Sequence, residues 1–184
     1  MAIALDDASR EKLAGVLADL PRSAGLRWAA AHQLHLTLKF LGECPETRVP
    51  DVCRVMSEAA SRLAPFELEL GGVGAFGERR APRVLWCGAQ DRSDGCRRWL
   101  AAADAGLEPL GFPRELREFH AHVTLARAKS PRGAALLAHW LADPPASLRD
   151  FRHTLVAREV LLYESLLGSG GAQYAVVGRA SLTE

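Results

Sequence analysis

The pattern His-apolar-Thr-Leu occurs twice in this chain, at residues 35–38 (HLTL) and 122–125 (HVTL). Alternate side chains of a β-strand lie on the same face, so each copy would present a histidine and a threonine on one face and apolar residues on the other. The pattern predicts two strands, each backed by a core and each carrying a polar pair. If the strands lie side by side, the pairs meet in one cleft; the alternative is a chance repeat in a leucine-rich sequence.

The chain as a whole favours an α+β fold with a mainly antiparallel sheet, because strands and helices alternate without a regular βαβ rhythm and hairpins are common. No linker divides the 184 residues, which predicts a single domain over 1–184. The expected strands are 2–5, 34–42, 66–70, 83–88, 122–127, 151–156, 158–165 and 173–179, with a GSGG loop at 168–171 between the last two. The expected helices run from a cap at Asp7 or Ser9 to Leu20, over 45–63, from a cap at Asp94 to Leu107, and from Ser130-Pro131 to Leu141.

Strand parity makes predictions for the residues beside the two motifs. Leu36, Leu38 and Phe40 alternate with His35 and Thr37, so we expect all three to face the core. Strict alternation places Arg127 on the face opposite His122. A role for Arg127 in the cleft therefore requires the strand to end or twist by Ala126; otherwise Arg127 is an ordinary surface arginine.

Composition limits the class of partner. The formal net charge is +1, arginine greatly outnumbers lysine, and no basic tail is present. A protein that coats nucleic-acid duplexes carries a strong positive excess, so this balance favours a small substrate or one end of a nucleic acid. No run of 18 apolar residues and no signal-peptide pattern occurs, which predicts a cytoplasmic protein without membrane contact. The four cysteines form no C-x-x-C motif and are expected to be unpaired.

Residues 72–77 (GVGAFG) spell G-x-G-x-x-G directly after a predicted strand, as a dinucleotide-binding turn would. That turn requires its third glycine to open a helix whose N-terminus meets the pyrophosphate. Here Pro82 and a β-rich run follow instead. We therefore interpret the stretch as a bent connection between two strands.

Two histidines and two threonines in one cleft would suit acid–base chemistry. Near neutral pH one imidazole can be neutral and the other protonated, so one ring can take a proton from water while the other gives one to a leaving oxygen. The hydroxyls of Thr37 and Thr124 can donate to phosphate oxygens. The pattern thus favours phosphodiester hydrolysis without a metal or another cofactor.

HLTLKFLG (35–42) and HVTLAR (122–127) resemble the paired signatures of the two-histidine phosphoesterase superfamily. The chain is most similar to its bacterial and archaeal RNA 2′,3′-cyclic phosphodiesterases, also called the 2′-5′ RNA ligase family. The resemblance extends over nearly the whole chain in family order. It also includes RW at 27–28, PRVLWCG at 82–88, REFHAHVTLAR at 117–127, LYES at 162–165 and Tyr174.

The resemblance implies a bilobal fold of two pseudo-symmetric antiparallel sheets, flanked by helices around a central cleft. It implies hydrolysis of RNA or nucleoside 2′,3′-cyclic phosphate ends to 2′-phosphates, and the family name adds the reverse reaction that forms a 2′-5′ linkage. His35 maps to the proton donor and His122 to the proton acceptor, while Thr37, Thr124 and Arg127 would bind the phosphate. The spacing assigns neither histidine its role, so the reverse assignment stays open. A monomer is expected, because one chain builds the cleft.

Two other functions fit the same residues. A non-catalytic binder of RNA ends or nucleotides could use the cleft, although binding does not require a proton-transfer pair. A metal-dependent hydrolase could use His120 and His122, which strand parity places on one face, but no nearby carboxylate completes an obvious ligand set. Around the cleft we expect aromatic residues to stack a base and arginines to attract phosphates. The aromatic candidates are Phe76 and Trp86, with Phe40 as a third that strand parity assigns to the core. The arginines are Arg79, Arg80, Arg83, Arg114 and Arg117, and for each of them an ordinary solvated surface position is the alternative.

Overall fold

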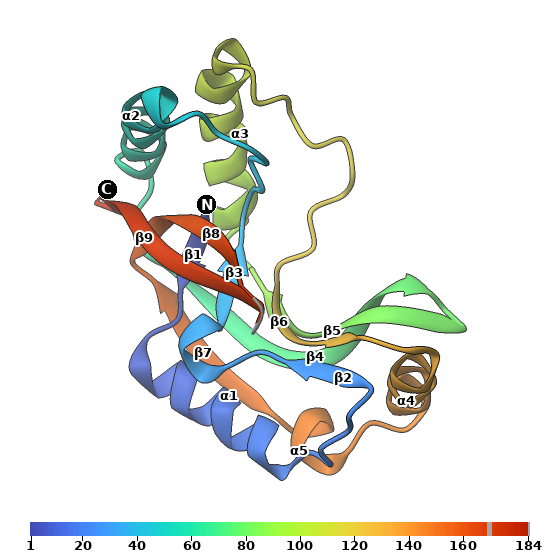
Figure 1. Cartoon of the computed structure of the whole chain (residues 1–184). Coiled ribbons are helices and arrows are strands. Elements are labelled where there is room, and N and C mark those ends of the chain that lie inside the picture. Colours follow the sequence, from blue (N-terminus) through green and yellow to red (C-terminus); the bar gives the residue numbers. More distant parts are fainter. Residues whose placement is uncertain (169–170, 184) are drawn as a thin grey trace.

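The structure, a computed structural model, describes residues 1–168 and 171–183, and consists of one strongly curved antiparallel sheet with helices at both ends of the curve (Figure 1). The strands are β1 (Ala2–Ala4), β2 (Leu26–Trp28), β3 (His35–Thr37), β4 (Phe66–Glu78), β5 (Ala81–Gln90), β6 (His122–Ala128), β7 (Arg152–Ala157), β8 (Glu159–Gly168) and β9 (Gly171–Ser181). The α-helices are α1 (Asp7–Asp19), α2 (Val49–Ala60), α3 (Gly95–Leu107), α4 (Pro131–Ala142) and α5 (Ala146–Arg149). Short 3₁₀ helices are η1 (Ala31–Gln33), η2 (Glu46–Arg48) and η3 (Glu108–Leu110).

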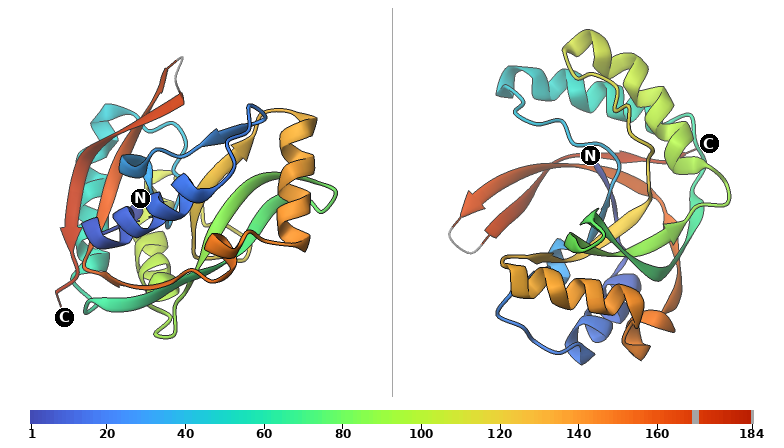
Figure 2. Two further views of the ribbon diagram at one scale, coloured as in Figure 1. Left: turned by 90° about the horizontal axis from the view of Figure 1, so that it is seen from below. Right: turned by 90° about the vertical axis from the view of Figure 1, so that its right-hand side faces the viewer.

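The strand order β7-β4-β5-β6-β3-β1-β8-β9, with β2 paired to β6, confirms the predicted α+β class and antiparallel pairing. The two expected sheets are joined into one at the contact between β3 and β6, where Leu36 pairs with Val123. Helices α4 and α5 pack on the β4–β5–β6 half, and α2 and α3 pack together over the β8–β9 half. The side view in Figure 2 shows these two helical groups on opposite sides of the curved sheet. None of the described helices is long and apolar enough to cross a membrane.

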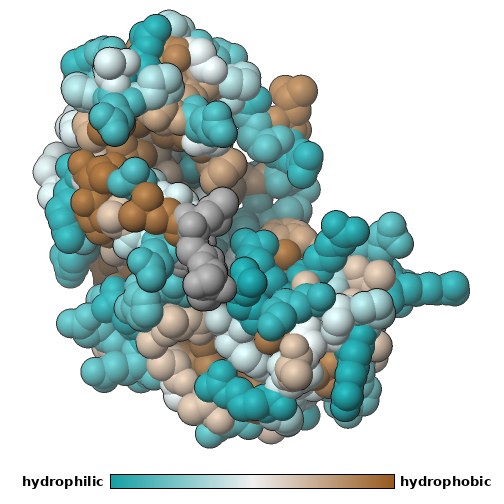
Figure 3. Space-filling model, viewed as in Figure 1, coloured by the Kyte–Doolittle hydropathy of each residue, from teal (hydrophilic) through white to brown (hydrophobic). Residues whose placement is uncertain are grey.

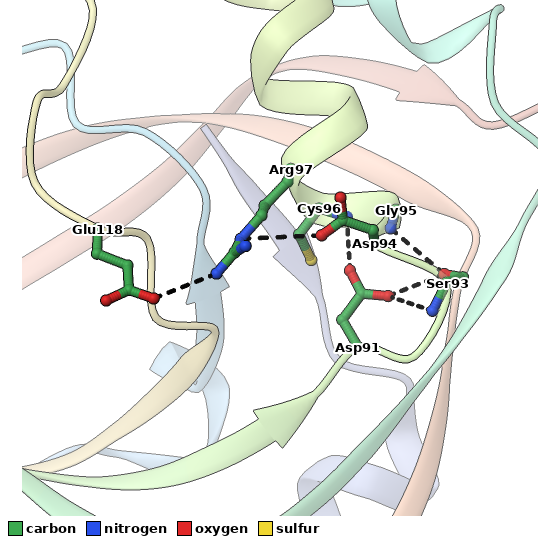
Figure 4. A network of polar contacts seen from close by, with 7 residues as sticks. All are labelled: Asp91, Ser93, Asp94, Gly95, Cys96, Arg97 and Glu118. Atoms are coloured by element: carbon green, nitrogen blue, oxygen red, sulfur yellow. Dashed lines mark hydrogen bonds and ion pairs between the residues drawn. The ribbon is translucent and has the colours of Figure 1, made fainter.

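Most expected elements are present, and their ends differ for local reasons. Asp6, not Asp7 or Ser9, caps α1, since its carboxylate accepts from the Ser9 amide at 2.7 Å. Asp94 occupies the cap position of α3 but has a left-handed backbone (φ 57°) and makes no side-chain cap bond. Asp91 replaces it by accepting from the Cys96 amide at 2.7 Å (Figure 4). Ser130 caps α4 as predicted.

The strand β2 and the short helix α5 were not expected from the sequence. The GSGG loop predicted at 168–171 lies partly outside the described residues.

The interpretation of residues 72–77 as a connection between strands is wrong, because β4 continues through them to Glu78. The ladder between β4 and β5 shifts register between Gly71 and Val73 and again between Phe76 and Gly77. Gly72 and Gly77 have positive φ angles of 70° and 111°, which glycine adopts without steric cost. The glycines therefore bend a long strand at two bulges rather than end it.

The strand predicted over 34–42 is confined to His35–Thr37, and this overturns one core prediction. Leu36 and Leu38 are buried as expected, but the Phe40 side chain is 84% exposed. The amides of Leu38 and Lys39 both donate to the Met1 carbonyl, so the chain leaves regular strand geometry before Phe40. Parity no longer applies there.

A buried ion pair fixes the segment after β3. Lys39 Nζ lies 2.6 Å from Asp104 Oδ1 on α3 and donates to the Pro113 carbonyl at 2.8 Å. The two side chains are 6% and 13% exposed. One ammonium thus links the end of β3, the helix α3 and the segment that leads to β6.

Loss of this ammonium should destabilise the fold strongly. Lys39→Met keeps most of the stem but leaves the buried Asp104 carboxylate with only the 3.8 Å contact to the mostly exposed Arg114. We expect a fall of about 3–5 kcal/mol in the free energy of unfolding, measured by urea denaturation. Lys39→Met with Asp104→Leu should recover most of the loss, because no uncompensated charge remains. Arg54→Met, which breaks an exposed pair with Glu58, should leave the midpoint unchanged. If Lys39→Met and Arg54→Met changed the stability equally, the Lys39–Asp104 pair would not be a special stabilising contact of the fold.

Candidate active site

The structure brings the two polar pairs of the repeated motif into one pocket of about 460 Å³, which we call the histidine pocket. His35 and Thr37 project from β3, and His122 and Thr124 from β6, the two strands that meet at the centre of the sheet. Figure 3 shows this face of the molecule hollowed between its upper and lower parts, with hydrophilic residues along the lower edge of the hollow and hydrophobic residues at its upper left. The repeat in the sequence therefore corresponds to two strands that face one site.

The two histidines are anchored in the same way. The Nδ1 atom of His35 lies 2.7 Å from the carbonyl oxygen of Gln33, and that of His122 lies 2.7 Å from the carbonyl oxygen of His120. A carbonyl only accepts hydrogen bonds, so both Nδ1 atoms carry the proton. Each neutral ring consequently keeps its lone pair on Nε2, the nitrogen available for proton transfer.

Aromatic rings hold each imidazole from the side. Two tyrosines from the β8–β9 hairpin pack on His35, and a phenylalanine and a tryptophan from the β4–β5 hairpin pack on His122. Both hairpins therefore pack aromatic rings on the histidine of their own half of the fold. Phe76 and Trp86 lie beside His122 but do not line the histidine pocket, whereas Phe40, which strand parity assigned to the core, lines it. The ring centroids are 5.3 Å apart for His35–Tyr163, 4.9 Å for His35–Tyr174, 4.7 Å for His122–Phe76 and 6.1 Å for His122–Trp86.

The histidine pocket has a positive electrostatic character. Arg27 and Arg127 line it together with Lys39, whose charge is compensated by Asp104 at 2.6 Å, and no carboxylate lines the pocket among the described residues. Burial lowers the pKa of His35 and of His122 below 6.5, and the Arg127 charge lowers the pKa of both further. Both rings are thus kept neutral near pH 7 in the free protein, and the cations favour an anionic ligand.

Arg127 lies in the histidine pocket despite its unfavourable parity. Trp86 on β5 pairs with Thr124, but Leu85, the next residue, pairs with Ala126, so Leu125 has no opposite partner. This bulge reverses the alternation, and Leu125 and Ala126 are both buried. The strand therefore shifts before Ala126 in the way that a cleft role for Arg127 requires.

The sequence did not single out Arg27 or Lys39 as residues of the pocket. Arg27 lies on β2, where it pairs with Arg127 of β6, and both line the pocket. The dipeptide RW at 27–28, part of the family resemblance, could have pointed to Arg27. The strand β2 has only three residues, too few for an alternation of apolar and polar side chains to be recognised. The five arginines expected at the cleft mouth (Arg79, Arg80, Arg83, Arg114 and Arg117) do not line the histidine pocket.

The residues around His120 do not form a metal site within the described part of the chain. No group of three His, Cys, Asp or Glu side chains that could hold a metal ion occurs there. His120 Nε2 lies 3.9 Å from Glu118 Oε2, and both side chains are mostly exposed. The ligand set that a metal-dependent reaction would need from His120 and His122 is thus not assembled in these residues.

Two neutral imidazoles, two hydroxyls and two arginines around one pocket are groups that could bind a phosphate ester and move protons to and from it. The chain belongs to the family described as LigT-like phosphoesterases, whose match covers residues 3–86. An RNA 2′,3′-cyclic phosphodiesterase of Archaeoglobus fulgidus is 32% identical over 156 residues, which cover 83% of this chain and 86% of that protein. One of Geobacillus stearothermophilus is 34% identical over 128 residues, 69% of this chain but only 40% of that longer protein.

Solved structures agree with this membership. A crystal structure of a Thermus thermophilus protein superposes with a TM-score of 0.80 at 30% identity and covers 98% of this chain and 95% of its own. Escherichia coli LigT in complex with 3′-AMP superposes with a TM-score of 0.72 at 26% identity, covering 100% of this chain and 95% of its own. The fold is therefore shared along the whole length of the chain.

Gly74 should control the environment of His122 through Trp86. A Cβ atom at Gly74 would lie 2.1–2.7 Å from the indole ring, which packs beside His122. Gly74→Ala should displace the indole, admit water and raise the lowered pKa of His122 toward 6.5. The ring's titration, followed by NMR, measures this. Gly15→Ala, where nothing lies within 4 Å, is the matched control, and an unchanged His122 titration in Gly74→Ala would refute the expectation.

Proposed function

We propose that the protein hydrolyses 2′,3′-cyclic phosphates at RNA ends to 2′-phosphomonoesters, with His35 as the acid and His122 as the base and without a metal or cofactor. The observation that carries the proposal is the pair of Nε2 atoms made available by identical Nδ1 anchors at one cationic pocket. The names of the relatives, RNA 2′,3′-cyclic phosphodiesterase, supply the substrate.

The proposed reaction balances with these groups alone. Water gives a proton to Nε2 of neutral His122 as its oxygen forms a bond to phosphorus. The bond between phosphorus and the 3′-oxygen breaks, and this oxygen takes the proton on Nε2 of His35. Thr37 and Thr124 donate hydrogen bonds to the non-bridging oxygens, and the Arg127 charge stabilises the negative charge that grows on them.

The proposal also covers the substrate, the cellular compartment and the oligomeric state. The substrate is RNA with a cyclic phosphate end or a small cyclic nucleotide, and the protein acts in the cytoplasm as a monomer. The same groups, used in reverse, would join a 5′-hydroxyl to a cyclic phosphate as a 2′-5′ linkage. A non-catalytic binder would need the cations of the pocket but not the free Nε2 atoms.

Removal of either imidazole should abolish turnover while the fold survives. We expect His35→Ala and His122→Ala each to lower the rate on a nucleoside 2′,3′-cyclic phosphate about 10²–10⁴-fold, measured in excess chelator with the phosphomonoester identified by chromatography. A substrate with a p-nitrophenolate leaving group needs no acid, so it should restore the rate of the variant that lacks the acid only. Recovery in His122→Ala instead would reverse the two roles.

Loss of wild-type turnover in chelator would support the metal-dependent alternative. Binding of the cyclic nucleotide without any turnover would support the non-catalytic alternative.

The pH dependence follows from burial of the two rings. The base must be neutral and the acid protonated, and burial lowers the pKa of both below 6.5 in the free protein. The profile of kcat/KM should therefore be a bell with its maximum below pH 6.5, and it should fall through neutrality as the acid loses its proton. The bound phosphate raises the pKa of both rings, so the profile of kcat should lie at higher pH. A kcat/KM maximum above pH 6.5 would count against two buried rings as the titrating pair.

A further inference from the structure

Two arginines lie directly opposite each other on neighbouring strands of the histidine pocket. Strand β6 pairs with β5 along one edge, and with β3 and then β2 along the other. In the ladder between β2 and β6, Arg27 is the register partner of Arg127, and both residues line the pocket. We call these two residues the arginine pair.

The arginine pair has no negative charge beside it within residues 1–168 and 171–183. Directly opposite side chains on antiparallel strands lie close together on one face, so two like charges there repel each other. Arg54, Arg149 and Arg179 each contact a carboxylate, but neither member of the arginine pair forms an ion pair with a described residue. An anion between the two guanidinium groups would remove the repulsion. The arrangement therefore fits a bound anion better than it fits the free protein.

The arginine pair lies to one side of the place where the cleaved phosphate would bind. In the proposed reaction this phosphate sits between His35 and His122, within reach of Thr124. Arg127 follows Thr124 by three residues on β6, one of them the extra residue of the bulge, which corresponds to about 7–10 Å along the strand. Arg27 lies at the level of Arg127 and has no part in the proposed reaction. The pair is thus placed to hold a second phosphate, next to the first along the strand.

Positive charge continues along β6 beyond the arginine pair. Lys129 follows Arg127 by two residues, so alternation places both side chains on the same face. The Lys129 amide donates to the Gly25 carbonyl at 2.8 Å, which extends the pairing with the β2 segment to this position. A nucleic-acid backbone that left the pocket in this direction would therefore meet a further cation.

From this arrangement we infer that the arginine pair binds the phosphate on the 5′ side of the terminal nucleoside, an inference that rests on the proposed function. This phosphate and the cyclic phosphate belong to one nucleotide and are joined through its ribose. The last nucleotide of an RNA chain carries both groups, whereas a nucleoside 2′,3′-cyclic phosphate carries only the cyclic one. Arg27 therefore makes the enzyme prefer RNA ends to free nucleoside cyclic phosphates.

The experiment compares three substrates with the same reacting group: adenosine 2′,3′-cyclic phosphate, its 5′-phosphorylated form, and the dinucleotide ApA with a 2′,3′-cyclic phosphate end. We expect the wild-type kcat/KM to be about tenfold higher for the second and third than for the first, because each has one additional charge-assisted phosphate contact. Arg27→Gln should remove most of this preference, mainly through KM, since the contact is the same in the ground and transition states. Arg27→Lys keeps the charge but not the planar fork, and should retain part of the preference.

Arg80→Gln is the matched control, because it removes one exposed arginine that does not line the pocket and changes the net charge equally. Its preference should equal that of the wild type. The inference would be overturned by equal losses in Arg80→Gln and Arg27→Gln, by a wild type without the preference, or by a preference for the dinucleotide alone, which would place the contact on its extra nucleoside. A wild-type enzyme that hydrolyses none of the three substrates would instead overturn the proposed function.

Calorimetry supplies a measurement that does not depend on turnover. Adenosine 2′,5′-bisphosphate should bind the wild-type protein about tenfold more tightly than adenosine 2′-phosphate does. The two ligands should bind Arg27→Gln with similar affinity. The same affinity ratio in Arg27→Gln as in the wild type would exclude Arg27 from the site of the second phosphate.

Discussion

The contact between β3 and β6 is the constraint on which the rest of the site depends. Leu36 and Val123 form the single register pair that joins the two halves of the sheet, and both side chains are completely buried. Because side chains alternate along a strand, burial of this pair turns His35 and His122, each one residue earlier, to the opposite face. The core therefore positions the two imidazoles, and a shift of one residue in either strand would bury a histidine.

The two halves of the fold surround their histidines in the same way, although their sequences differ outside the two motifs. In each half a histidine donates from Nδ1 to the carbonyl two residues earlier, and a β-hairpin supplies two aromatic rings against it. The halves differ in what lies beyond these rings. Helices α2 and α3 pack together over the β8–β9 half, whereas α4 and α5 pack on the β4–β5–β6 half. The two halves are thus alike around their histidines and differ in the helices that cover them.

Much of this could be predicted from residue patterns, and the failures have local causes. Alternation found the strands of both motifs, and the Ser130-Pro131 signal located the start of α4. Parity failed at Phe40, where β3 ends early, and it could not place Arg127, because the bulge at Leu125 depends on the pairing with β5. The position of Arg27 in the pocket depends on the pairing of β2 with β6, two segments far apart in the sequence. Patterns within one strand carry no information on such contacts.

The lowered pKa of both histidines keeps the two rings neutral until an anion binds beside them. Burial lowers the pKa of each ring, and no carboxylate lines the histidine pocket among the described residues to oppose this effect. A fixed carboxylate beside His35 would keep that ring protonated, but it would also repel the phosphate. The bound phosphodiester supplies the missing negative charge itself, so the acid gains its proton when the substrate is present. Under the proposed mechanism, the same pocket would both select an anion and protonate the acid that cleaves it.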